Sequence, residues 1–180
     1  MVHQLKHRGI GLVLALACSG AGALVGQETL KVDPTWLKID SIHKVEFTLI
    51  AGLTPANGGM NFNGAVSGGL TLTVPATWTV VLHFRNHDQM LPHSAMVIAA
   101  VVPVPVSGAT AAFPHAATRQ PEQGLGTDGH EDVEFVADRP GSYLIFCAVP
   151  GHGAVGMWIR LEVSSTAHLP EVAVTAPKAP

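Results

Sequence analysis

The stretch FCAVPGHGAVGMW, residues 146–158, decides how this chain is interpreted. It closes a run of hydrophobic residues and contains Cys147, the only cysteine apart from Cys18 near the N-terminus. Four residues separate Cys147 from His152, and four more separate His152 from Met157. A thiol, an imidazole and a thioether on one short loop are soft ligands for a transition metal. The loop therefore predicts a metal site at the end of a strand.

The sequence around this loop is typical of short β-strands separated by turns. From about Trp36 onward, the segments HKVEFTLIAG (43–52) and GLTLTV (69–74) alternate apolar and polar residues, which predicts half-buried strands. The run SAMVIAAVV (94–102) is apolar throughout and predicts a central strand. Further strands are expected in TWTVVLHFRN (77–86), EDVEFVAD (131–138), GSYLIFC (141–147) and GMWIRLEV (156–163). Many short strands divided by Gly and Pro indicate an all-β sandwich or barrel.

The chain has 180 residues, which predicts one domain with appendages. Residues 1–26 place basic residues ahead of an uncharged apolar run, the layout of a signal peptide. Three interpretations stay open: cleavage after Ala23, lipid attachment at Cys18, or a retained N-terminal membrane anchor. Each predicts an exported protein in the periplasm or another extracytoplasmic space, with membrane association through this segment in the last two cases.

The domain itself is expected at residues 36–163. Residues 103–129 show no regular pattern of apolar and polar residues, so we expect a long insertion on the surface that contains a helical turn. Residues 164–180 are rich in Pro and Ala and predict a flexible C-terminal tail. The formal net charge is −3 and no basic patch is evident, which argues against nucleic acid as a partner.

A second imidazole is needed if the metal is copper in a type 1 site, because such a site combines two His and one Cys with a distant axial Met. His93 is the preferred candidate, since it lies between Pro92 and an apolar run that begins a strand. His87 is the competitor, but its polar neighbours predict an exposed turn. A thioether is a poor zinc donor, so Met157 favours copper over zinc. The remaining candidates are predicted to lie at the surface: His83, His115, His130 and His168.

Three segments together resemble the cupredoxins, the blue copper electron carriers. They are FNGAVSGGLTLTVPATWTVVLHFRN (62–86), LPHSAMVI (91–98) and FCAVPGHGAVGM (146–157), and they are most similar to the sulfocyanin branch, with the rusticyanins next. The resemblance extends over roughly residues 62–163. It implies a cupredoxin-like Greek-key β-sandwich with one long surface insertion. It also implies one copper ion, held by four residues: His93, Cys147, His152 and Met157.

Two groups are candidates for hydrogen bonding beside the thiolate, namely the backbone N–H of Ser94 and, as the resemblance implies, Asn86. Both are expected to tune the reduction potential through hydrogen bonding. A dry site with a weak Met ligand predicts a fairly high potential. The loop between Cys147 and Met157 contains no charged residue, so an apolar rim is expected around His152.

These features predict an exported outer-sphere electron carrier between respiratory redox partners, and not an enzyme. A His next to the Cys would connect to a second copper, but Cys147 is flanked by Phe146 and Ala148. The resemblance implies a transient partner such as a cytochrome or a terminal oxidase. The main alternative is a copper storage or delivery protein with the same fold. A small copper oxidase and a metal-free adhesive sandwich are further alternatives.

Overall fold

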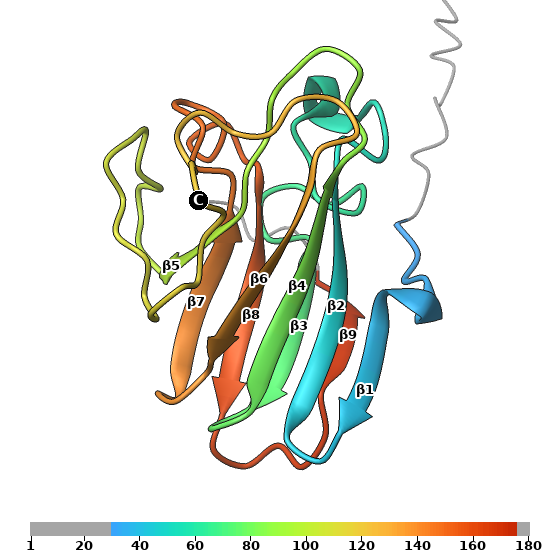
Figure 1. Ribbon diagram of the computed structural model, residues 1–180, viewed down its shortest axis with the longest axis vertical. Helices are drawn as coiled ribbons and strands as arrows, with labels where there is room; N and C mark the ends of the chain where they lie inside the picture. Colours follow the sequence, from blue (N-terminus) through green and yellow to red (C-terminus); the bar gives the residue numbers. More distant parts are fainter. Residues whose placement is uncertain (1–29, 176–180) are drawn as a thin grey trace, which may run out of the picture.

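Two β-sheets packed face to face form the body of the protein (Figure 1). The computed structural model describes residues 30–175, so the predicted leader at residues 1–26 lies outside the described residues. No helix within the described range is long and apolar enough to cross a membrane. The elements are η1 (Pro34–Trp36), β1 (Leu37–Ser41), β2 (Lys44–Ala51), η2 (Ala56–Gly59), β3 (Leu70–Pro75), β4 (Thr79–Asn86), β5 (Met96–Ala99), β6 (His130–Val136), β7 (Gly141–Phe146), β8 (Trp158–Ser164) and β9 (Glu171–Val174).

The first sheet has the strand order β1-β2-β4-β6, and the second has the order β5-β7-β8-β3-β9. The β2–β4 and β3–β8 pairs are parallel, whereas all other neighbours are antiparallel. Parallel neighbours cannot be joined by a hairpin, so the chain crosses between the sheets as in a Greek key. The predicted all-β Greek-key sandwich is confirmed.

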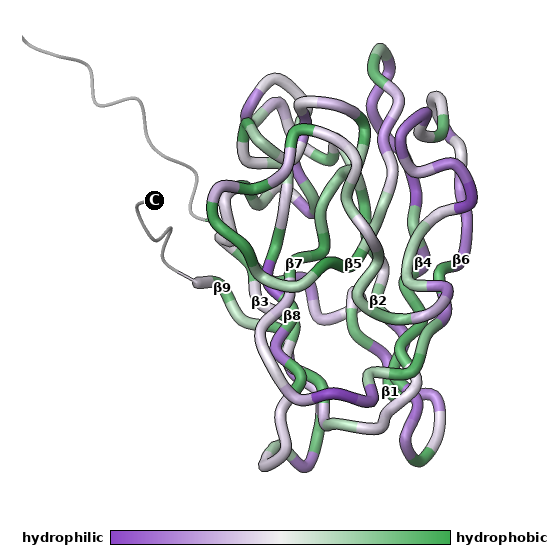
Figure 2. Tube along the Cα trace, turned by 90° about the vertical axis from the view of Figure 1, so that its left-hand side faces the viewer, coloured by the Kyte–Doolittle hydropathy of each residue, from purple (hydrophilic) through white to green (hydrophobic). Residues whose placement is uncertain are grey.

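The core lies between the sheets because polar and apolar residues alternate along the strands. In β2 and β8 every second residue is buried, and the change of colour along the tube in Figure 2 reflects this alternation. The fully buried side chains include Phe47, Phe84 and Ile159, each of which contributes roughly 1.5–3 kcal/mol by leaving water. The period of two therefore fixes which face of each strand points inward.

The connections that follow β4 and β7 lie at the same end of the sandwich (Figure 1). Asn86, the last residue of β4, pairs with Ala51 at the end of β2. Phe146, the last residue of β7, pairs with both Met96 and Trp158 at the beginnings of β5 and β8. This end therefore gathers the segments that contain the predicted metal ligands.

The prediction of a central strand at residues 94–102 is wrong. Only residues 96–99 form β5, and β5 is an edge strand of the second sheet. Both faces of β5 are apolar because each face packs against a different hydrophobic cluster. Val97 belongs to the main core, whereas Met96 and Ile98 form a second cluster that is covered by residues of the 103–129 segment. An edge strand can thus be apolar throughout when a connection covers its outer face.

The 103–129 segment is more than a surface excursion. It contains no regular helix or strand, but isolated bridges join Ala117 to Met96 and Leu125 to His93. Phe113 is only 2% exposed and packs against the rings of Phe135 and Tyr143. The middle of the segment is therefore part of the core.

The segment expected to be a flexible tail, residues 164–180, also differs from that expectation. Residues 171–174 form β9, which pairs antiparallel with β3, and the N–H of Thr175 donates to the carbonyl of Gly69 at 3.0 Å. The main-chain hydrogen bonds to β3 hold this strand in place, although its side chains are mostly exposed. Residues 176–180 lie outside the described range.

Replacing Phe113 by Ala should lower the free energy of unfolding by about 3–5 kcal/mol, because a buried ring is removed and a cavity is left between two aromatic neighbours. Chemical denaturation of the metal-free protein measures the change. Val106→Ala is the control in the same segment, since Val106 is 62% exposed and should change stability by less than about 0.5 kcal/mol. Equal effects of the two substitutions would show that the segment is an ordinary surface loop.

Candidate metal centre

Strand alternation directs three of the four predicted ligands into the interior. Tyr143 and Ile145 of β7 face the main core, and Cys147 follows in the same phase. On the other side of the loop, Met157 precedes Ile159 in the inward phase of β8. Both sulfur-containing residues are fully buried. The sequence places these side chains inward for the same reason that it places the core residues inward.

His93 reaches the same point from the other side. It precedes Ala95 and Val97, which both belong to the main core, and its side chain is 0% exposed. Its main-chain N–H and carbonyl are paired with Leu125, at 3.1 and 2.7 Å. Gly124 allows this pairing, because a Cβ at that position would lie 3.0 Å from the main-chain N and O of His93, and its φ is +71°. The 103–129 segment therefore holds His93 in place.

Three ligand atoms converge at this end of the sandwich. Cys147 Sγ lies 3.9 Å from His93 Nδ1 and 3.6 Å from His152 Nδ1, and the two Nδ1 atoms are 3.2 Å apart. Metal bonds of about 2.0–2.3 Å in a trigonal plane would separate such donors by roughly 3.5–3.7 Å. The geometry of the three residues is therefore compatible with a single small metal ion.

The electrostatic environment of His93, Cys147 and His152 favours metal binding. Burial lowers the pKa of His93, and it also lowers the pKa of His152, so both imidazoles are held in the neutral form that binds metals. Burial raises the pKa of the Cys147 thiol, against hydrogen bonds from Ser94 and Val149 that act in the opposite direction. A buried thiolate is costly without a cation beside it. A bound cation would thus satisfy all three groups together.

Met157 is placed beside the cluster by its main chain. The N–H of Cys147 donates to the carbonyl of Met157, and the N–H of Met157 donates to the carbonyl of His152, each at 3.0 Å. These two hydrogen bonds connect the beginning, the middle and the end of the loop that joins β7 to β8. The position of Met157 is therefore compatible with its predicted role as the axial ligand.

Ser94 is a hydrogen-bond partner of the sulfur, as expected. Its N–H donates to Cys147 Sγ at 3.4 Å, and its hydroxyl lies 3.7 Å from the same sulfur while accepting the N–H of Ala148 at 3.0 Å. Asn86 has a different role from the one expected. Its side-chain amide donates to the carbonyls of Leu91 and Leu125, both at 2.9 Å, so it organises the connection that carries His93.

The five other histidines considered as candidates do not belong to the cluster. His87 is exposed, as its polar neighbours suggested, and so are His115, His130 and His168, whereas His83 is half-buried. His83 lies in the first sheet, with its Nδ1 2.8 Å from the carboxylate of Asp132.

Asp88 is the site residue that sequence reasoning missed. Its Oδ2 lies 3.1 Å from His93 Nε2, on the opposite side of the ring from the cluster. In the sequence, Asp88 is one of several polar residues around His87 and has no pattern that distinguishes it. Only the fold of the connection after β4 turns its carboxylate toward His93.

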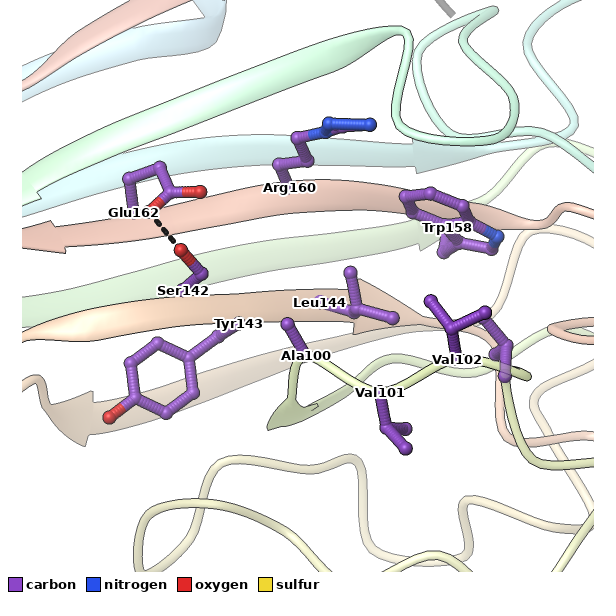
Figure 3. A pocket seen from close by; sticks show the side chains of 10 residues that line it. Ala100, Val101, Val102, Ser142, Tyr143, Leu144, Trp158, Arg160 and Glu162 are labelled. Carbon is purple, nitrogen blue, oxygen red and sulfur yellow. Dashed lines mark hydrogen bonds between the residues drawn. The ribbon is translucent and has the colours of Figure 1, made fainter. Parts of the chain in front are cut away.

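Two hollows on the surface are lined by residues outside the cluster. One of about 300 Å³ lies on the outer face of the second sheet, where Trp158 and Leu144 face Val102, and where Ser142 donates to Glu162 at 2.7 Å (Figure 3). A neighbouring groove of about 790 Å³ is lined by residues 102–106, residues 154–156, Ser67, Trp158 and Arg160. Neither hollow opens onto the ligand atoms.

A two-sheet sandwich with inward His, Cys and His residues at one end defines the cupredoxin class. Within this class the chain belongs to the sulfocyanin family, because residues 33–174 match the family described as the Sulfocyanin (SoxE) domain. Sulfocyanin from Sulfolobus acidocaldarius is 32% identical over 117 residues, which cover 61% of this chain and 58% of that protein. The chain thus spans little more than half the length of this relative.

Solved structures show the same fold at lower identity. A rusticyanin variant superposes with a TM-score of 0.51 at 21% identity, over 72% of this chain and 87% of the other. A second rusticyanin variant gives 0.51 at 22% identity, over 72% and 87%. The resemblance deduced from the three sequence segments is confirmed by the family match.

Proposed function

We propose that the protein is a mononuclear type 1 copper protein that acts as an exported outer-sphere electron carrier. The observation that carries the proposal is the convergence of His93, Cys147 and His152 within 4.8 Å of one another in a buried place. Copper is the metal that suits two imidazoles, one thiolate and a nearby thioether. The similarity to the sulfocyanin of Sulfolobus acidocaldarius supports the same assignment.

The copper would supply a one-electron couple, and the protein supplies a fixed geometry. His93, Cys147 and Met157 are fully buried, and each of the three takes part in main-chain hydrogen bonds with another element or across the loop. These ligands therefore have little room to move when the charge of the site changes. Small rearrangement is the condition for fast electron transfer without bond making or breaking.

His152 provides the route to the surface. It is the only one of the four predicted ligands that is not fully buried, and it lies on a loop with exposed apolar residues. Val155 is 56% exposed, and across the neighbouring groove Val102 and Val106 are 83% and 62% exposed. The N–H of Gly151 donates to the carbonyl of Val106 at 2.9 Å, so the two segments are joined. We infer that a redox partner docks on this apolar surface.

The partner and the compartment follow from the same proposal. A cytochrome or a terminal oxidase would meet the carrier transiently, since electron-transfer contacts are small and weak. The basic and apolar residues at positions 1–26 would direct the chain to the periplasm or another extracytoplasmic space, either free or associated with the membrane.

The storage or delivery alternative fits less well. Carriers that release copper use accessible ligands, whereas Cys147, His93 and Met157 are fully buried. A site that is closed on all but one ligand favours retention of the metal during many electron-transfer cycles.

Purified protein with one equivalent of Cu(II) should show an intense visible thiolate charge-transfer band that ascorbate bleaches. Cys147→Ser and His93→Ala should abolish the band, whereas His87→Ala should keep it, because His87 is exposed and away from the cluster. Absorption and electron paramagnetic resonance spectra test this. Copper that binds without the band and passes readily to a chelator would support storage instead.

Met157→Gln should lower the reduction potential, because an amide oxygen is a harder ligand that stabilises the oxidised metal. Redox titration followed at the visible band measures the shift. Met60→Gln is the matched control, since Met60 is half-buried in another loop. A potential that is the same in wild type and Met157→Gln would show that Met157 is not an axial ligand.

Val155→Asp should slow electron self-exchange roughly tenfold, because two like charges would meet when two copies approach through this surface. NMR line broadening in mixtures of the oxidised and reduced protein measures the rate, and the visible spectrum should stay unchanged. Val136→Asp is the control: Val136 is 49% exposed and pairs with Thr79, at the opposite end of the first sheet. Equal slowing by both substitutions would locate the contact elsewhere.

A further inference from the structure

We propose that Asp88 is a positioning residue for the metal centre: it fixes the ring of His93 with Nδ1 toward the cluster, and its charge favours the oxidised metal. This inference rests on the proposed copper function. It assigns to the centre a carboxylate that is not among the predicted ligands.

The hydrogen bond determines the tautomer of His93. Asp88 Oδ2 lies 3.1 Å from His93 Nε2, and an ionised carboxylate can only accept. The proton therefore sits on Nε2, and the lone pair of Nδ1 faces Cys147 Sγ at 3.9 Å. A carboxylate behind a metal-binding imidazole orients the ring and makes it a stronger donor.

The other carboxylate oxygen anchors the connection after β4. Asp88 Oδ1 accepts the N–H of Met90 at 2.8 Å and that of Leu91 at 3.0 Å. The N–H of Asp88 itself donates to Asn86 Oδ1 at 2.9 Å. The two oxygens thus have separate roles. Oδ2 contacts His93, whereas Oδ1 accepts the main-chain N–H groups that fix the orientation of the carboxylate.

Two glycines from a distant connection enclose the carboxylate. Gly52 and Gly59 follow β2 and have φ values of +67° and +89°. A Cβ on Gly52 would lie 2.7 Å from Asp88 Cβ, and a Cβ on Gly59 would collide with Asp88 Oδ2. The main chain can approach this closely only because both residues lack a side chain. As a result, the Asp88 side chain is only 11% exposed.

The negative charge of Asp88 lies next to the ring of His93. Among residues 30–175, the ion pairs of Asp88 involve only this histidine. The N–H groups of Met90 and Leu91 and the His93 ring surround the carboxylate, and such donors favour its ionised form. A negative charge in a poorly solvated place stabilises the more positive oxidation state of the metal beyond the ring. This effect opposes the high potential that a dry site would otherwise favour.

Asp88→Asn separates the positioning role from the anchoring role. The Asn oxygen can still accept the N–H groups of Met90 and Leu91, while its NH₂ group would face the N–H of His93 and cannot accept from it. In copper-loaded protein at a fixed ambient potential, we expect the ratio of reduced to oxidised protein to rise about tenfold, which equals about 1.4 kcal/mol. Asp128→Asn is the matched control, because Asp128 lies in the connection before β6 with its side chain 69% exposed, and should leave the ratio unchanged.

Nitrogen NMR of the His93 ring provides a readout that does not depend on copper. The metal-free wild type should show a proton on Nε2 that exchanges slowly with water, and Asp88→Asn should lose this protection. A wild-type protein with the proton on Nδ1 would overturn the proposal, as would an unchanged redox ratio in Asp88→Asn. If the wild type showed no thiolate band with copper, the proposed function would fail, while the NMR result would still decide whether Asp88 positions the ring.

Discussion

A sulfur atom sealed inside a β-sandwich is the constraint on which the rest of this structure depends. Cys147 is fully buried because it continues the inward phase of β7, after Tyr143 and Ile145. An apolar interior disfavours a thiolate unless opposite charge or hydrogen-bond donors lie beside it. The N–H of Ser94 and the two imidazoles supply the surroundings of the sulfur, and each comes from a connection at the same end of the sandwich. The site therefore exists where the strands end.

Main-chain hydrogen bonds hold most of the segments that carry the predicted ligands. Hydrogen bonds between Cys147 and Met157, between Met157 and His152, and between His93 and Leu125 use backbone groups that any sequence could provide. Side chains with special roles are few: Ser94 beside the sulfur, and Asn86 and Asp88 in the connection after β4. Such a division makes the geometry depend on the fold, while a small number of polar side chains adjust the electrostatics.

The sequence predicted those parts of the structure that depend on local pattern. Strand alternation limited the fold to an all-β sandwich or barrel, and the resemblance to the cupredoxins selected the sandwich. The even spacing of Cys147 and His152 and the place of His93 before an apolar run indicated the cluster that the structure brings together. What the sequence did not reveal depends on contacts between distant segments. The burial of Phe113 requires Phe135 and Tyr143, and the role of Asp88 requires a connection that folds back on His93. The edge position of β5 follows from the same cause, because its apolar outer face is covered by residues that have no period of their own.

The short strand β9 has a consequence for how copies of the protein behave toward one another. Without β9, the second sheet would end at β3 and present a row of free N–H and C=O groups, which invites pairing with a strand of another chain. β9 covers that row, and its own outer side is only four residues long and begins with a charged Glu171. A short, charged margin is a poor template for aggregation. This strand thus helps to keep the molecule separate from its neighbours, and the proposed role of an electron carrier with transient contacts would benefit from that separation.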